Sequence, residues 1–91
     1  MPYPELVNFS QTLTVLCFDD NKLRSISEEA LRQVPQLKLL RLSNNQLTHL
    51  PDSLFSLSAL TLLDVSFNML SSFSPKVSLL RQLRSLNIAE N

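Results

Sequence analysis

The segment Leu37-Lys38-Leu39-Leu40-Arg41-Leu42-Ser43-Asn44-Asn45-Gln46-Leu47-Thr48-His49-Leu50 decides the fold of this 91-residue chain. Apolar residues alternate with polar ones around its centre, where Leu40 and Leu42 flank Arg41. This period of two predicts a β-strand with one buried face. A single asparagine, Asn45, follows the strand and precedes a further pair of spaced leucines.

The same spacing of leucines and asparagine occurs four times along the chain. The four asparagines lie 24, 23 and 23 residues apart, and they are Asn21, Asn45, Asn68 and Asn91. Parallel neighbouring strands need a crossover of about a dozen residues, and each repeat supplies one after its asparagine. No single repeat encloses its own apolar side, so stacked repeats form the core. We expect an N-terminal flank or partial preceding repeat at 1–12, whole repeats at 13–36, 37–59 and 60–82, and an incomplete fourth repeat at 83–91.

This pattern resembles the leucine-rich repeat family, in the class of 23–24-residue repeats common in intracellular proteins, and the resemblance covers residues 13–91. It implies an α/β fold, a right-handed solenoid with a parallel sheet on its concave side and short helical or 3₁₀ segments on its convex side. It also implies that the four asparagines form a structural ladder. A carboxamide offers two donors and an acceptor to the backbone groups that leave the sheet at each turn.

The return segments, which follow the asparagine within each repeat, carry signals for short helices. Ser27 can cap one, with Glu28-Glu29 at its positive end and Arg32 near its negative end. Ser74-Pro75 is a similar pair of cap and first-turn residue. We expect the apolar residues of these convex segments to lie in the core. Because Asn91 leaves the fourth repeat without a return segment, we also expect a piece of a longer solenoid or an incompletely capped one.

Composition narrows the function and the compartment. Eight basic and eight acidic residues cancel, which argues against a nucleic-acid or anionic-membrane partner, and no apolar run approaches the roughly 20 residues of a membrane helix. The first ten residues do not resemble a secretion signal, so Asn8-Phe9-Ser10 is interpreted as a chance match to the glycan acceptor pattern. A lone cysteine, Cys17, favours a reducing compartment, and we predict a cytoplasmic or possible nuclear location.

No group of residues in the sequence predicts catalysis. Cys17 is expected on the concave side of the first strand and His49 on a turn towards the convex side, too far apart for a nucleophile and its base. One cysteine and one histidine are too few for a zinc site, and Asp19-Asp20 lacks the spacing of a calcium loop. The absence of glycine removes any glycine-rich phosphate loop. We predict no enzymatic activity, no cofactor and no metal.

The outward-facing positions of the sheet are the candidate site. Three aliphatic residues are expected to form a row across the strands with an aromatic beside it, a composition typical of the centre of an interface. A leucine at the third position is also frequent in the family, and Arg41 could simply pair with Asp64 across the strands. The residues predicted to bind a partner are Val15, Leu39, Arg41, Leu62, Asp64, Phe67 and Arg84.

The sequence therefore favours a non-catalytic protein–protein interaction module that presents a concave parallel sheet. One alternative is a leucine-rich repeat segment that regulates a larger signalling enzyme. Another is a structural part of a cytoskeletal or ciliary assembly, in which the convex side or the edges make the contacts. Recognition of a non-protein ligand is disfavoured because such solenoids have more repeats and cysteine-bearing caps. The partner is a protein whose identity the sequence leaves open, as it does the oligomeric state.

Overall fold

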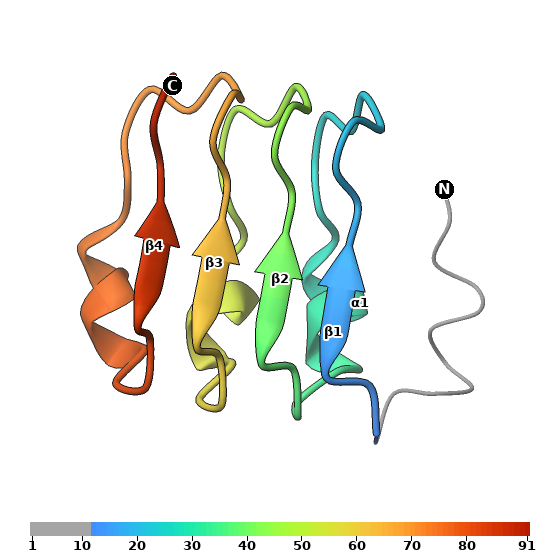
Figure 1. The fold of residues 1–91 in the computed structure, drawn as a ribbon, viewed down its shortest axis with the longest axis vertical. Coiled ribbons are helices and arrows are strands. Elements are labelled where there is room, and N and C mark those ends of the chain that lie inside the picture. Colours follow the sequence, from blue (N-terminus) through green and yellow to red (C-terminus); the bar gives the residue numbers. More distant parts are fainter. Residues whose placement is uncertain (1–11) are drawn as a thin grey trace.

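The computed structural model describes residues 12–91 and contains one parallel sheet of four short strands. The strands are β1 (Val15–Cys17), β2 (Leu39–Arg41), β3 (Leu62–Asp64) and β4 (Ser85–Asn87), and they lie side by side in chain order (Figure 1). Most of the predicted flank at 1–12, including Asn8-Phe9-Ser10, lies outside the described residues.

A second layer lies behind the sheet and consists of one helical segment per crossover (Figure 1). These segments are α1 (Glu28–Arg32), η2 (Asp52–Ser56) and η3 (Pro75–Leu79), the last two being 3₁₀-helices. The sheet on one side and the short helices on the other confirm the predicted solenoid. With five residues each, no helix within residues 12–91 is long and apolar enough to cross a membrane.

The predicted helix caps are confirmed. The Ser27 hydroxyl accepts hydrogen bonds from the backbone N–H groups of Glu29 and Ala30, at 3.1 and 3.3 Å. The Ser74 hydroxyl accepts one from Lys76 N–H at 3.1 Å. Each serine thus satisfies N–H groups that have no partner inside the first helical turn.

Links between neighbouring convex segments were not predicted. The Glu28 carboxylate accepts a hydrogen bond from Ser53 N–H at 3.0 Å, so an acidic residue of α1 caps η2 in the next repeat. The Lys76 ammonium lies 3.0 Å from the Asp52 carboxylate, which connects η3 to η2. Both contacts join positions 24 or 25 residues apart, and they hold successive repeats together on the convex side.

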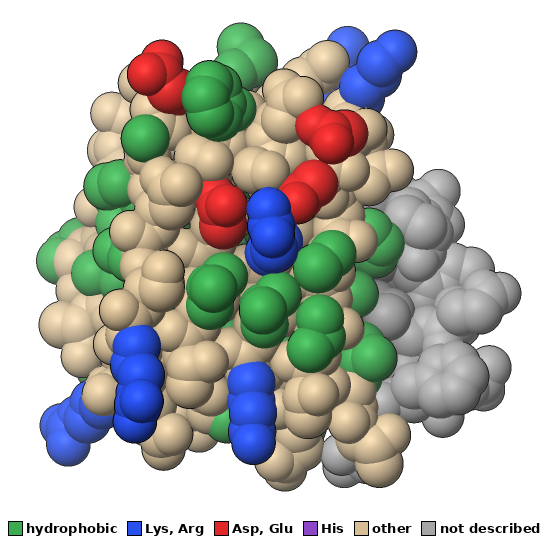
Figure 2. All heavy atoms as spheres, viewed as in Figure 1, with side chains coloured by type: hydrophobic (Ala, Val, Ile, Leu, Met, Phe, Trp, Pro, Cys, Tyr) green, Lys and Arg blue, Asp and Glu red, His purple; other side chains and the backbone are tan. Residues whose placement is uncertain are grey.

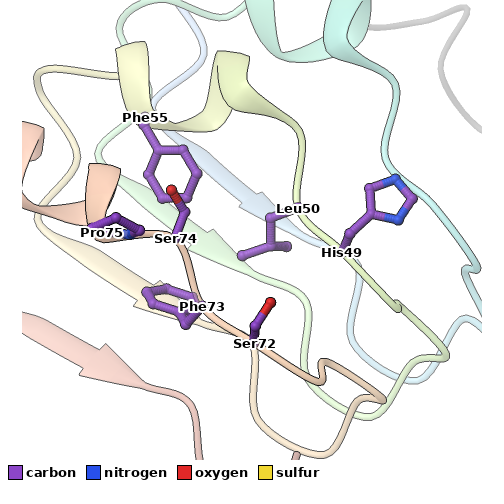
Figure 3. A pocket seen from close by; sticks show the side chains of 7 residues that line it. All are labelled: His49, Leu50, Phe55, Ser72, Phe73, Ser74 and Pro75. Carbon is purple, nitrogen blue, oxygen red and sulfur yellow. The ribbon is translucent and has the colours of Figure 1, made fainter.

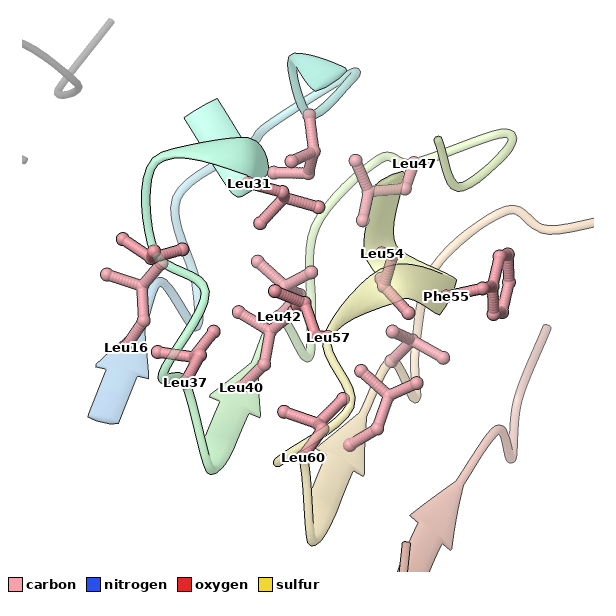
Figure 4. Packing of buried hydrophobic residues seen from close by; sticks show 14 of the residues in the cluster. Leu16, Leu31, Leu37, Leu40, Leu42, Leu47, Leu54, Phe55, Leu57 and Leu60 are labelled. Atoms are coloured by element: carbon pink, nitrogen blue, oxygen red, sulfur yellow. The ribbon is translucent and has the colours of Figure 1, made fainter. Parts of the chain in front are cut away.

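The core lies between the two layers and consists mainly of leucine (Figure 4). Burying one leucine side chain contributes about 1.5–3 kcal/mol, so the repeated positions dominate the stabilisation of the fold. On the convex side Phe55 and Phe73 meet edge to face, with ring centroids 6.3 Å apart. The largest fully buried side chains are Leu31, Val34, Leu37, Leu40, Leu42, Leu47, Leu54, Leu60, Leu63 and Val65.

Burial decreases in the fourth repeat. Leu86 and Ile88 are 40% and 43% exposed, although they occupy the positions of fully buried residues in the preceding repeat. Leu79 in η3 is 57% exposed, so the prediction that every apolar residue of the convex segments lies in the core is wrong there. In the described structure η3 packs against η2 on one side and has no convex segment on the other.

Candidate functional site

The asparagine of the second repeat lies where the strands turn away from the sheet. The Asn45 side-chain oxygen accepts hydrogen bonds from the backbone N–H groups of Asn21 and Leu23, at 3.0 and 2.9 Å. Its nitrogen donates to the carbonyls of Phe18 and Leu42, both at 2.9 Å. One carboxamide thereby bonds to the turn of its own repeat and to the turn of the preceding one.

Two later asparagines repeat this geometry. The Asn68 oxygen accepts from Leu47 N–H at 3.1 Å, and the Asn91 oxygen accepts from Leu70 N–H at 3.0 Å. The first asparagine differs, because within residues 12–91 the Asn21 side chain makes one hydrogen bond, to the carbonyl two residues before it. All four side chains bond to backbone groups, an arrangement that fixes the turns.

The outward face of the sheet brings together three predicted site residues. Strand pairing places Val15 beside Leu39, and Leu39 beside Leu62. Val15 is 52% exposed, and the other two are partly exposed. We call these three residues the apolar stripe, and Figure 2 shows hydrophobic side chains gathered across the middle of this face. Arg84 lies exposed immediately before β4.

The charged residues beside the stripe pair differently from the suggestion made by the sequence. Arg41 forms its ion pair with Asp19, at 3.2 Å, and not with Asp64. The Asp64 carboxylate instead accepts hydrogen bonds from the N–H and hydroxyl of Ser66, at 3.0 and 2.7 Å. Asp19 lies two residues after Cys17, the strand residue paired with Arg41, and it reaches the guanidinium from the first repeat. Figure 2 shows acidic and basic side chains close together just above the hydrophobic row.

Phe67 is held in an unusual backbone conformation. The eighth residue of every repeat has a left-handed φ of 55–62°, and these residues are Asp20, Asn44, Phe67 and Glu90. Aspartate and asparagine adopt this region readily, whereas a bulky aromatic side chain does so at a cost. Phe67 is also 57% exposed, so burial does not offset that cost. Residues held in sparsely populated conformations cluster at functional sites, which supports Phe67 as part of the candidate site.

A groove lies at the edge of the sheet where the strands begin. It has a volume of about 500 Å³ and carries two guanidinium groups, those of Arg81 and Arg84. Lys38 is exposed at the same position in the second repeat that Arg84 occupies in the fourth. No acidic group lies within ion-pair distance of these three cations in the part of the chain from residue 12 onward. Arg84 was predicted from the sequence as a site residue, whereas the groove was not.

The convex side has a smaller hollow of about 300 Å³ between the second and third repeats. Figure 3 shows the Phe55 and Phe73 rings on one side of it and the His49 ring at its edge. The His49 ring nitrogen Nδ1 lies 3.2 Å from the Thr48 hydroxyl. The lining residues are His49, Leu50, Phe55, Ser72, Phe73, Ser74 and Pro75.

The structure does not bring the candidate catalytic residues together. Cys17 is exposed in β1, on the outward face of the sheet, whereas His49 lines the hollow on the convex side. Within residues 12–91 there is no group of three or more histidine, cysteine, aspartate or glutamate side chains that could hold a metal ion. The outward face of the sheet is therefore the candidate functional site.

Comparisons with known proteins point to the same repeat. The family model described as leucine rich repeat matches residues 35–91. In a solved structure of a leucine-rich repeat protein from Leptospira interrogans, a region superposes with a TM-score of 0.86 and 26% sequence identity. That match covers 94% of this chain and 21% of the other.

Three relatives illustrate the range of proteins that contain similar repeats. Chicken lumican is 41% identical over 69 residues, which is 74% of this chain and 20% of lumican. A Drosophila melanogaster leucine-rich repeat and calponin homology domain-containing protein is 46% identical over 56 residues, 60% of this chain and 7% of that protein. Mouse platelet glycoprotein Ib alpha chain is 44% identical over 72 residues, which is 79% of this chain and 9% of that protein.

The chain spans about a fifth of the lumican that it matches and less than a tenth of the other two relatives. Proteins of this family are generally non-enzymatic and generally act as protein-interaction modules. The repeat spacing, the parallel sheet with its turn asparagines, and the matching family model agree that this chain belongs to the leucine-rich repeat family.

Proposed function

We propose that this chain is a non-catalytic protein-binding module and that a protein partner binds the outward, concave face of its sheet. The observation that carries the proposal is the exposure of large apolar side chains on a rigid surface. Val15 and Phe67 are 52% and 57% exposed, and both lie on this face. Exposed apolar side chains that gather on one face, with a polar surround, are typical of protein interaction sites.

Preorganisation supports the same proposal. The strands are fixed to one another by the sheet and the asparagine side chains, so little conformational freedom is lost when a partner binds. Arg41 is held by Asp19, which limits the motion of its long side chain before the partner arrives. The residues proposed to contact the partner are Val15, Leu39, Arg41, Leu62, Asp64, Phe67 and Arg84.

The test is a combined substitution in the full chain, Leu39→Ser, Arg41→Ser, Leu62→Ser and Phe67→Asn, followed by affinity capture from cell extract. We expect captured proteins to be lost from this variant. A matched control changes Arg32→Ser and Leu79→Ser, one cation and one exposed leucine on the convex segments. Circular dichroism establishes that both variants keep the fold. Capture that survives the concave changes and is lost with the convex ones would contradict the proposal.

We also propose a cytoplasmic or nuclear location. The support is Cys17, the single cysteine of the sequence. Its thiol is exposed and free in the described structure. Small secreted domains usually carry several paired cysteines. Because one relative is named a glycoprotein, the test combines cell fractionation with glycosidase treatment. A shift in electrophoretic mobility that Asn8→Gln removes would contradict this location.

A further inference from the structure

The concave face is electrically divided along the strand direction. The cations Lys38, Arg81 and Arg84 lie where the strands begin, and we call them the basic end. Carboxylates gather where the strands finish, on the other side of the apolar stripe. Figure 2 shows basic side chains below the hydrophobic row, whereas the acidic side chains lie above it together with further basic ones. A net charge of zero for the whole chain conceals this division.

The carboxylates are not equally available to a partner. Asp19 is already paired with Arg41, and the Asp20 carboxylate accepts a hydrogen bond from the Asn44 side chain at 2.6 Å. Asp64 and Glu90 have no cation within ion-pair distance in the portion of the structure from 12 to 91. We call Asp64 and Glu90 the acidic end. Glu90 occupies the position next to Phe67 in the following repeat, so the exposed aromatic lies beside uncompensated negative charge.

Along the strand direction Glu90 lies about 20 Å from the basic end, since six extended residues at roughly 3.3 Å each separate it from Arg84. Asp64 is three residues beyond the register of Arg84 and lies about 10 Å from the basic end. At moderate ionic strength the Debye length is about 8–10 Å, so Glu90 lies about two Debye lengths from the basic end and Asp64 about one, and a partner experiences Glu90 and the basic end as separate charges. Charges arranged in this way fix the orientation of a bound molecule and disfavour the reverse orientation.

We infer that the concave face binds a protein segment with a fixed charge order, in which apolar side chains separate an acidic residue from a basic one. The acidic residue lies at the basic end, over the groove formed with Arg81 and Arg84. The apolar side chains cover the stripe, and the basic residue lies over Asp64 and Glu90. This inference rests on the proposed function and adds the chemistry and the orientation of the partner.

The experiment presents a displayed library of random 16-residue peptides to the full chain. Enriched sequences are synthesised, and their dissociation constants are measured by isothermal titration calorimetry. We expect the enriched peptides to carry opposite charges on the two sides of an apolar group. Enrichment of apolar peptides without charges, of peptides with one sign of charge on both sides, or of none at all would overturn the inference.

Charge exchange then tests the orientation. The double variant Lys38→Glu, Arg84→Glu should bind a selected peptide about tenfold more weakly, because two attractions become repulsions. A peptide whose acidic residue is replaced by lysine should recover that affinity on this variant. Arg24→Glu is the matched control, an exposed cation outside the basic end, and it should leave binding unchanged. Failure of the exchanged peptide to recover would contradict the assigned orientation.

The acidic end has its own variant. Glu90→Lys with Asp64→Asn reverses the charge at position 90 and neutralises position 64, and the asparagine keeps a side-chain oxygen for the hydrogen bonds from Ser66. This double variant should bind the selected peptide several-fold more weakly than the unchanged chain does. It should also bind the peptide with lysine in place of its acidic residue more weakly by a similar factor, because that replacement faces the basic end and not the acidic end. Replacing the three stripe residues with serine separates the two claims. Binding that resists this change refutes the proposed function itself, whereas binding that depends on the stripe but ignores both charge variants refutes only the charge order.

Discussion

Removal of the Asn45 side chain should destabilise the fold far more than removal of the chemically identical side chain of Asn21. The two asparagines occupy equivalent positions in consecutive repeats, 24 residues apart. They differ in the groups that depend on them. Asn45 accepts hydrogen bonds from two backbone N–H groups of the preceding turn, while the Asn21 side chain donates to one exposed carbonyl.

The size of the effect follows from which backbone groups lose their only partner. In Asn45→Ala the N–H of Leu23 becomes buried without an acceptor, and the partly buried N–H of Asn21 loses its acceptor too. The carbonyl of Leu42 keeps the hydrogen bond from Asn68. An unsatisfied buried backbone group costs about 1–3 kcal/mol, so Asn45→Ala should lower the free energy of unfolding by about 2–4 kcal/mol.

Two further asparagine variants give losses in the free energy of unfolding with which Asn45→Ala can be compared. Asn68→Ala leaves one buried donor, Leu47 N–H, without its acceptor and should lower the free energy of unfolding by about 1–3 kcal/mol. Asn21→Ala leaves its partner carbonyl open to water and should lower it by less than about 0.5 kcal/mol. A domain of this size has a total stability on the order of 5–10 kcal/mol, so these differences are large enough to resolve.

The assay is urea unfolding followed by far-ultraviolet circular dichroism, which needs no tryptophan. The expected order of midpoints is wild type and Asn21→Ala highest, Asn68→Ala lower and Asn45→Ala lowest. The slope of the transition should be similar in all four proteins, because the same surface is exposed on unfolding. Equal losses for Asn21→Ala and Asn45→Ala would refute the reasoning, since the effect would then come from the asparagine itself and not from the groups it satisfies.

Three other predictions concern stability and use the same unfolding measurement. Phe67→Asn should raise the free energy of unfolding by about 1 kcal/mol, because asparagine accepts the left-handed backbone more readily; a lower value would show that the aromatic ring stabilises the turn. Leu63→Ala should cost about 2–5 kcal/mol and Leu86→Ala less than half as much, because the first is fully buried and the second is 40% exposed. Glu28→Ala should cost about 1 kcal/mol through the lost cap on η2, and Glu29→Ala should have little effect; equal losses would assign the effect to helix charge alone.

The sequence was sufficient for the fold because its repeated leucines allow one arrangement. Leu40 and Leu63 are buried and paired in β2 and β3, as a common register requires. The helix starts at Ser27 and Ser74 were also predictable, since capping depends on the residues next to the cap. Most of the architecture was therefore predictable from the strict repeat period and from capping interactions between residues close in the sequence. The repeat boundaries stay a prediction.

Contacts between repeats could not be predicted in the same way. The partner of Arg41 depends on which of two carboxylates is free, and Asp64 is engaged by Ser66 two residues later. The cap that Glu28 gives to Ser53 joins residues 25 positions apart, and no pattern within one repeat indicates it. Such contacts depend on side-chain directions and on the stacking distance between repeats, which appear only once the solenoid is built.

The candidate site was predictable to a different extent, because fold and surface use opposite faces of the same strands. Inward residues are fixed by packing, so they carry no information about a partner. Outward residues such as Val15 and Lys38 face solvent, and their chemistry is free to vary from repeat to repeat. Phe67 is the exception, because it lies outward and also strains the backbone that carries it. A side chain that makes the fold less stable while facing solvent needs a reason outside the fold, and its place on the same face as the apolar stripe, beside Glu90, supports binding as that reason.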